Sequence, residues 1–220
     1  MRQLMLLVTL LMLTAAAQAQ PVRFEVGVHY KMVQPAQPTN NADKVEVVEV
    51  FGYLCSHCNN FQPFIDSWSE RQPESVDYLR MPVVFQRAWG PFARFYYATE
   101  ALGILGQAHP AIFKAIHTDR QRLRSDEDLA GFVSQFGVSA EDYQRAARSF
   151  AVDTKMRRAV TMAQRYGVTG TPSVIVNGKY LVTASMAGGH AEFIEVIEFL
   201  VSLEGEVLQE RVEQAVTAES

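Results

Sequence analysis

The chain has 220 residues, of which 48% are hydrophobic, and a formal net charge of −4 at pH 7. The acidic balance argues against a general nucleic-acid binder, because such proteins present a basic surface. The length suits one large domain or a domain with an insertion, with enough apolar residues for a real core. Two cysteines are too few for a small scaffold held together by disulfides.

The first 19 residues have the pattern of a secretory signal peptide. Arg2 gives a positive start, an apolar run extends from Leu4 to Leu13, and Ala17-Gln18-Ala19 offers small residues for a signal peptidase. A membrane-anchoring helix is the alternative, but it needs about 20 apolar residues. We therefore expect export with cleavage after Ala19, into a compartment where disulfides persist.

Residues 45–51 are rich in β-branched side chains and predict a buried strand. A short turn at 52–54 follows. A helix is then expected up to Ser69, because apolar residues recur at helical spacing from Phe61 to Trp68. Pro63 is tolerated near the first turn of this helix and would kink it further in. Cys55 therefore lies at a strand-to-helix junction.

The position of Cys55 predicts a reactive thiol. A helix start presents unpaired N–H groups and the positive end of the helix dipole, which stabilise a thiolate and lower its pKa. His57, when protonated, would add a positive charge; Ser56 is its neighbour in the motif. Cys58 lies one turn into the helix and is expected to be more shielded. We expect Cys55 to be the exposed, attacking thiol and Cys58 to be the resolving thiol.

Two other uses of the pair are weaker. A disulfide between residues three positions apart closes a tiny loop, and short loops give little stabilisation. A structural zinc site needs four ligands, and the chain has no second cysteine pair. The remaining histidines stand singly, at His29, His109, His117 and His190.

The middle of the chain predicts helices. Residues 91–160 lack strand-like alternation and contain helical runs at 92–103, 108–117, 126–136 and 140–150. Ser125 and Ser139 are predicted N-caps, since acidic residues suited to a first turn follow each of them.

The last part of the chain predicts a hairpin and a helix. Asn177-Gly178 is a strong two-residue hairpin signal between a strand at 173–176 and a return strand from 179 to 182. Pro172 stands just before the first strand, and the sequence alone does not decide between a cis and a trans Thr171–Pro172 bond. A core helix is expected over 191–203, followed by a polar tail that is at most a loose helix.

Cys55-Ser56-His57-Cys58 after a strand, with Gly170-Thr171-Pro172 before a hairpin, resembles the thioredoxin-fold oxidoreductases. The export signal and the long helical insert narrow the resemblance to the DsbA-type periplasmic thiol:disulfide oxidoreductases. The resemblance implies an α/β thioredoxin fold with an inserted helical domain. Its first part would be 20–90, the insertion 91–160 and the second part 161–204, with a polar tail at 205–220.

The resemblance also implies a function. Such a protein would donate its Cys55–Cys58 disulfide to unfolded or reduced exported proteins in the periplasm, through a mixed disulfide. It would need no bound cofactor and no metal, and a DsbB-type membrane quinone reductase would reoxidise it. Apolar surface around Tyr53, Leu54 and the Thr171-Pro172 loop would hold the peptide. We expect a monomer that binds no nucleic acid.

Some positions depart from the familiar oxidase. It has proline where Ser56 stands and valine where Thr171 stands, so a disulfide reductase or isomerase stays an alternative. Isomerases of this kind usually carry a dimerisation domain, which is not visible here. A non-catalytic chaperone or metal-binding module is the alternative from another class. By position, Glu49 matches a buried glutamate of the family and Arg80 its lysine partner; a proton relay to the thiols and a simple salt bridge are both open.

Overall fold

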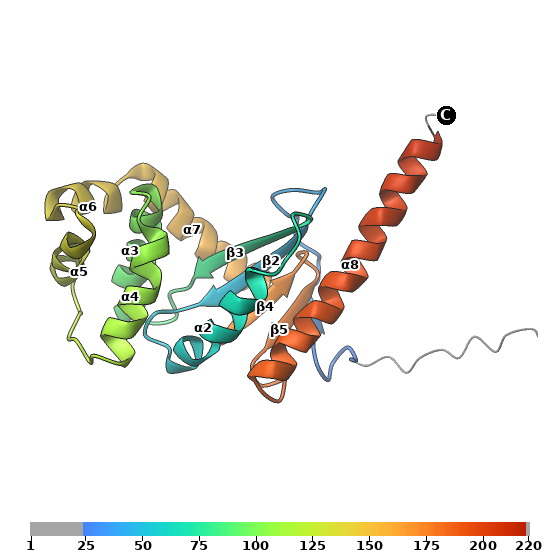
Figure 1. Ribbon diagram of the computed structural model, residues 1–220, viewed down its shortest axis with the longest axis horizontal. Coiled ribbons are helices and arrows are strands. Elements are labelled where there is room, and N and C mark those ends of the chain that lie inside the picture. Colours follow the sequence, from blue (N-terminus) through green and yellow to red (C-terminus); the bar gives the residue numbers. More distant parts are fainter. Residues whose placement is uncertain (1–23, 219–220) are drawn as a thin grey trace, which may run out of the picture.

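A five-stranded sheet lies at the centre of the computed structural model, which describes residues 24–218 (Figure 1). The predicted signal peptide and its cleavage site lie outside the described residues. The strand order is β1-β5-β4-β2-β3, where β2 and β3 run parallel and the other neighbours are antiparallel. The strands are β1 (Lys31–Met32), β2 (Val45–Phe51), β3 (Val76–Pro82), β4 (Ser173–Val176) and β5 (Tyr180–Thr183).

The central strand β2 is buried along its whole length. Val45 and Val47 join a core with helices α2 (Ser56–Ser69) and α8 (His190–Ala218), while Val48 and Val50 join a second core on the opposite face. A strand covered on both faces carries apolar residues in both registers, because successive side chains point to opposite faces. This burial explains the nearly continuous apolar run that predicted the strand.

The helices between β3 and β4 gather at one end of the sheet (Figure 1). We call residues 87–147 the helical lobe, and β1–β5 with α2 and α8 the sheet region. The second core is continuous between the lobe and the sheet, so the two are packed as one body. The lobe contains η1 (Arg87–Trp89), α3 (Gly90–Ala101), α4 (Leu105–His117), α5 (Asp126–Phe132), η2 (Val133–Phe136) and α6 (Ala140–Ala147).

The predicted N-caps of the lobe are confirmed. Ser125 caps α5 in a reciprocal capping box with Asp128, and the hydroxyl of Ser139 accepts a hydrogen bond from the Asp142 N–H at the start of α6. The helix predicted over 126–136 divides into α5 and a 3-10 turn, which ends at Gly137 in the left-handed region with φ 77°.

Helix α7 (Phe150–Arg165) leads from the lobe back to the sheet, and the sequence analysis predicted no helix over residues 151–165. Ser149 caps this helix, since its hydroxyl accepts from the Val152 N–H at 3.3 Å. The helix predicted over 140–150 therefore ends at Ala147, and the next one begins at Phe150. The predicted boundary between residues 160 and 161 falls inside α7.

The hairpin signal at Asn177-Gly178 is confirmed. Both residues have positive φ, 49° and 65°, and they join β4 to β5. The last helix differs from the prediction, because α8 does not end near residue 203 but continues to Ala218. The single Gly205 costs about 1 kcal/mol in a helix, and the residues after it are mostly helix formers. Side chains beyond Gly205 are largely exposed.

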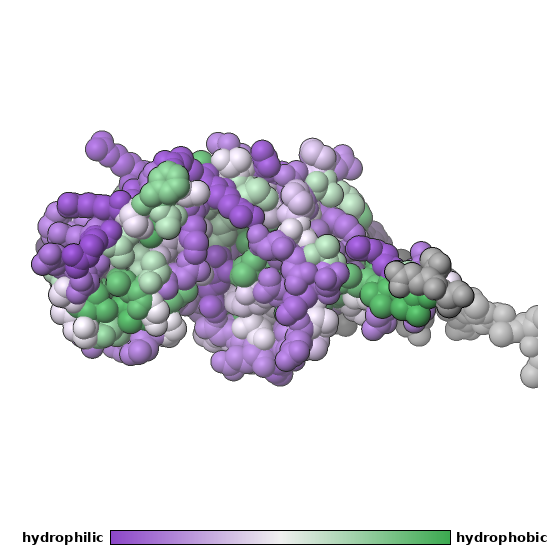
Figure 2. Space-filling model, turned by 90° about the horizontal axis from the view of Figure 1, so that it is seen from above, coloured by the Kyte–Doolittle hydropathy of each residue, from purple (hydrophilic) through white to green (hydrophobic). Residues whose placement is uncertain are grey.

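Figure 2 shows a mostly hydrophilic face on which hydrophobic residues gather over the helical lobe. Within residues 24–218, no helix combines the length and the apolar character needed to cross a membrane.

Candidate active site

Cys55 is the N-cap of helix α2, as the sequence predicts. Its backbone is extended, with φ −87° and ψ 114°, and its sulfur accepts a hydrogen bond from the Cys58 N–H at 3.4 Å. Both cysteines are free thiols; Cys55 is half-buried and Cys58 is buried. The motif thus presents one sulfur at the surface and covers the other.

The two thiols differ strongly in acidity. The pKa of Cys55 is lowered to about 5, chiefly because the Cys58 side chain donates a hydrogen bond to its sulfur. Partial burial opposes this effect, and the backbone N–H groups of His57 and Cys58 add to it. Burial raises the pKa of Cys58 far above its ordinary value, and the hydrogen bond with Cys55 raises it further. At neutral pH the pair is one thiolate and one thiol.

The Thr171-Pro172 loop lies against Cys55, although 116 positions separate the two in sequence. When Cys55 is protonated, its thiol donates to the Thr171 carbonyl at 3.4 Å, and the Thr171–Pro172 bond is cis. The side chain of Thr171 lies close enough to both sulfur atoms to lower the pKa of each thiol. Pairing of Ser173 with Val50 across β4 and β2 brings this loop to the strand end that precedes the cysteines.

The side chains of Ser56 and His57 are exposed. The backbone N–H of His57 contributes to the low pKa of Cys55. A functional role for either side chain stays a prediction.

Glu49 is fully buried on β2, and burial raises the pKa of its carboxyl group. Its oxygens accept hydrogen bonds from the Gln62 amide at 2.8 Å and from the Tyr78 hydroxyl. Arg80, its partner across β2 and β3, lies 3.4 Å away and also pairs with Asp66. The predicted proximity of Glu49 and Arg80 is confirmed, while the choice between a proton relay and a salt bridge stays open.

The sequence analysis missed a buried polar group beside the site. His109 on α4 lies 2.8 Å from both the Gln62 amide oxygen and the Tyr53 hydroxyl, and His117 Nε2 lies 2.7 Å from the Tyr53 carbonyl. The expectation that Tyr53 forms part of an exposed peptide-binding surface is wrong, because its side chain is 1% exposed. One signal was available: Gln62 is a polar residue beside Phe61 on the core face of α2.

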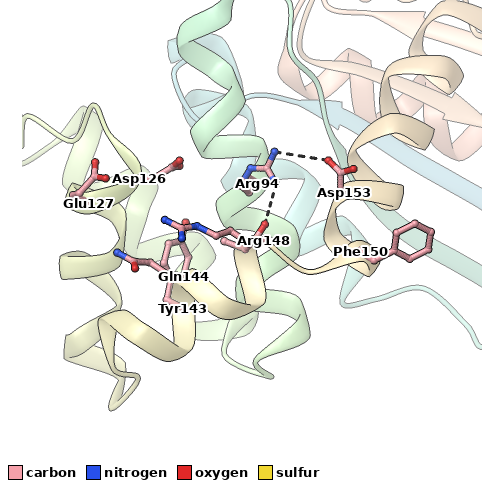
Figure 3. A pocket seen from close by; sticks show the side chains of 9 residues that line it. Arg94, Asp126, Glu127, Tyr143, Gln144, Arg148, Phe150 and Asp153 are labelled. Atoms are coloured by element: carbon pink, nitrogen blue, oxygen red, sulfur yellow. Dashed lines mark hydrogen bonds and ion pairs between the residues drawn. The ribbon is translucent and has the colours of Figure 1, made fainter.

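A cavity of about 550 Å³ lies elsewhere, on the helical lobe, between α3, α5, α6 and the start of α7 (Figure 3). Arg94 crosses it to Asp153, and Phe150 stands at its rim. None of the predicted site residues lines it. Among residues 24–218, no group of three or more His, Cys, Asp or Glu side chains could hold a metal ion.

A surface thiolate at a helix start, a buried thiol one turn later and a cis-proline loop define a thioredoxin-fold thiol–disulfide oxidoreductase. Comparison with known proteins agrees. Residues 79–192 match the family model of the DSBA-like thioredoxin domain. The DsbA thiol:disulfide interchange protein of Pseudomonas aeruginosa is 35% identical over 189 residues, covering 86% of this chain and 89% of the relative. That of Azotobacter vinelandii is 34% identical over 191 residues, covering 87% and 89%.

The chain belongs to the DsbA-like thioredoxin family and catalyses thiol–disulfide interchange. An alignment of 189 residues spans both the cysteine motif and Thr171-Pro172, wherever in the chain it begins. The family model, which begins at residue 79, spans Thr171-Pro172 but not the cysteine motif. Solved structures confirm the fold. Pseudomonas aeruginosa DsbA has a TM-score of 0.80 at 33% identity, over 84% of this chain and 97% of that one. DsbA from Xylella fastidiosa has a TM-score of 0.78 at 32% identity, over 83% and 98%.

Proposed function

We propose that the chain is an oxidase that donates its Cys55–Cys58 disulfide to reduced, unfolded proteins exported to the periplasm. The observation that carries the proposal is the opposite displacement of the two thiol pKa values, with Cys55 at about 5 and Cys58 far above normal. An acidic thiol stabilises the reduced pair as a thiolate, and a stabilised reduced form makes the disulfide a strong oxidant.

In the first step, a substrate thiolate attacks the Cys55 sulfur of the disulfide. A bond forms between the substrate and Cys55, the Cys55–Cys58 bond breaks, and the electron pair goes to Cys58. Cys58 then takes up a proton, because its high pKa favours the thiol at neutral pH.

In the second step, another thiolate of the substrate attacks the substrate sulfur of the mixed disulfide. Cys55 leaves with the electron pair as a thiolate, which is favoured because a sulfur of low pKa is the better leaving group. The substrate is oxidised to a disulfide, and two electrons remain on the Cys55–Cys58 pair. No organic cofactor or metal enters the scheme.

The setting of this reaction is proposed as well. Residues 1–19 direct export and are removed after Ala19, and the mature chain works as a monomer without binding nucleic acid. A DsbB-type membrane quinone reductase takes the two electrons and restores the disulfide. Half-exposed Leu54, together with Thr171 and Pro172, borders Cys55 where a peptide would lie. N-terminal sequencing of the exported protein should give Gln20 as the first residue.

The test is the equilibrium of the Cys55–Cys58 pair with glutathione buffers, combined with oxidation of a reduced, unfolded test protein. An oxidase requires a pair that stays reduced until glutathione is strongly oxidising, and a disulfide form that oxidises the test protein stoichiometrically. The double variant Cys55→Ser/Cys58→Ser is the control and should be inactive. A pair that glutathione oxidises easily would favour a reductase or isomerase. No exchange by the wild type would favour a chaperone or metal-binding module.

A further inference from the structure

Helix α4 of the helical lobe holds the turn that precedes the cysteines at two points. His109 near its start contacts the Tyr53 hydroxyl, and His117 at its end donates from Nε2 to the Tyr53 carbonyl. The two histidines are eight positions apart on one helix, so a single rigid element bonds to both the side chain and the backbone of Tyr53.

The hydrogen bonds fix which nitrogen of His109 carries the proton. Gln62 uses its amide N–H₂ to donate to Glu49, so its amide oxygen faces His109 Nε2 as an acceptor. Nε2 therefore carries the hydrogen, and Nδ1 accepts from the Tyr53 hydroxyl. Burial lowers the pKa of His109 to about 3, which keeps the ring neutral as this arrangement requires.

The turn held by α4 contacts both sulfur-bearing residues. The Gly52 carbonyl accepts a hydrogen bond from the Cys55 N–H at 3.0 Å. The Gly52 backbone N–H lies close enough to the Cys58 sulfur to lower the pKa of that thiol. The lobe also bounds the turn from another side, since a Cβ atom on Gly52 would come within 2.2 Å of the Trp89 indole. Residues 52–54 are thus enclosed by η1, by α4 and by the two cysteines.

We propose that His109 and His117 are positioning residues for thiol exchange. Through Tyr53 they fix the 52–54 turn, and so they fix the positions of the Cys55 and Cys58 sulfur atoms relative to each other. The inference rests on the proposed roles of the two cysteines. The hydrogen bond between the two sulfur atoms is what chiefly makes Cys55 acidic, and it depends on their separation. Preorganisation of this kind is sensitive to small displacements of the supporting residues.

The experiment follows the rate of Cys55 alkylation against pH in the reduced, full-length mature protein. His117→Ala removes the bond to the Tyr53 carbonyl and should lower the rate at pH 5 by at least about twofold, because less Cys55 is then ionised. His117→Gln places an amide N–H near the position of Nε2 and should restore the rate. Tyr53→Phe removes only the bond to His109 and should act in the same direction as His117→Ala.

His29→Ala is the matched control, because His29 also bonds to a backbone group, the Glu25 N–H at 3.0 Å, but in the N-terminal segment. It should leave the alkylation profile unchanged. Profiles of His117→Ala and Tyr53→Phe that superimpose on the wild type would overturn the proposal, whether or not the melting temperature falls. A wild-type profile without an acidic thiol would instead contradict the proposed function, and it is recorded before any variant is compared.

Discussion

In the sheet region, the Gly52 backbone and the loop at Thr171 act on the sulfur atoms directly, whereas in the helical lobe His109 and His117 form hydrogen bonds with Tyr53 and Gln62 but not with the sulfur atoms. The same lobe carries its own open cavity and its own capped helices, away from the thiols. The comparison separates two kinds of influence. Residues of the sheet region set the chemistry of the thiols, while the lobe contributes packing and contacts the turn before the cysteines through α4 and Trp89.

The largest expected effect lies within the sheet region, between the two thiols themselves. At pH 6, iodoacetamide should alkylate Cys55 at least about 100-fold faster than Cys58, because only Cys55 is a thiolate there. Peptide mapping after brief labelling measures the ratio. Cys58→Ser should label like the wild type and Cys55→Ser hardly at all. Equal labelling of both cysteines would remove the distinction on which the proposed mechanism depends.

The second effect concerns the stability of the two redox forms. A folded-state pKa of about 5 for Cys55, below the ordinary 9.0, stabilises the reduced fold fully above pH 9 and not at all below about pH 5. Between pH 5 and 8 Cys58 stays protonated and adds nothing. At pH 7 the reduced protein should melt on the order of 5 °C above the oxidised protein.

That difference should shrink steadily as the pH falls to 5. Calorimetry of both forms at several pH values follows the trend, with the Cys55→Ser variant as a control that has no such dependence. An oxidised form that melts higher at pH 7 would speak against a strongly oxidising pair.

The helical lobe should respond differently. Ser125→Ala removes the capping box of α5 and should cost about 1 kcal/mol of unfolding free energy. The rate of Cys55 alkylation should not change, because none of the contacts made by the 52–54 turn or the thiols described above involves a residue of α5. Ser125→Asp keeps an acceptor at the cap and serves as the matched control. A changed alkylation rate in Ser125→Ala would break the separation between lobe and site.

The smallest effect is expected at Thr171. Its side chain helps to lower the pKa of Cys55, and Thr171→Val keeps the shape while removing the hydroxyl. The pKa of Cys55 should rise slightly, with a change of less than about twofold in alkylation rate at pH 5. Absorbance of the thiolate at 240 nm against pH measures it, and Thr171→Ser is the control that keeps the hydroxyl. Superimposable curves for wild type and Thr171→Val would show that the hydroxyl has no electrostatic role.

Local patterns in the sequence were enough for much of the sheet region. The bounds of β2 were predicted correctly, and the N-terminal position of Cys55 followed from the strand that precedes it. The turn at Asn177-Gly178 was predictable because few residue pairs accept positive φ at both positions. The Ser125 and Ser139 caps were predictable for the same local reason.

The features that were missed depend on contacts between distant residues. Tyr53 and His109 are 56 positions apart, and Gln62 and His109 are 47 apart, so no local pattern relates them. An isolated histidine in an apolar helix gives no sign of its partner. The end of α8 was missed for another reason: one glycine was given too much weight in a segment of good helix formers.

The sulfur of Cys55 is also the cap of helix α2, and this double use links catalysis to the helix itself. A charged acceptor forms a stronger hydrogen bond with a backbone N–H than a neutral one does. Each time Cys55 passes from thiolate to disulfide, the hydrogen bond that caps the first turn of α2 becomes weaker. The bond becomes stronger again when Cys55 is released from the mixed disulfide as a thiolate. The amide hydrogen of Cys58 should therefore exchange with solvent more slowly in the reduced protein, so a single backbone N–H records the redox cycle.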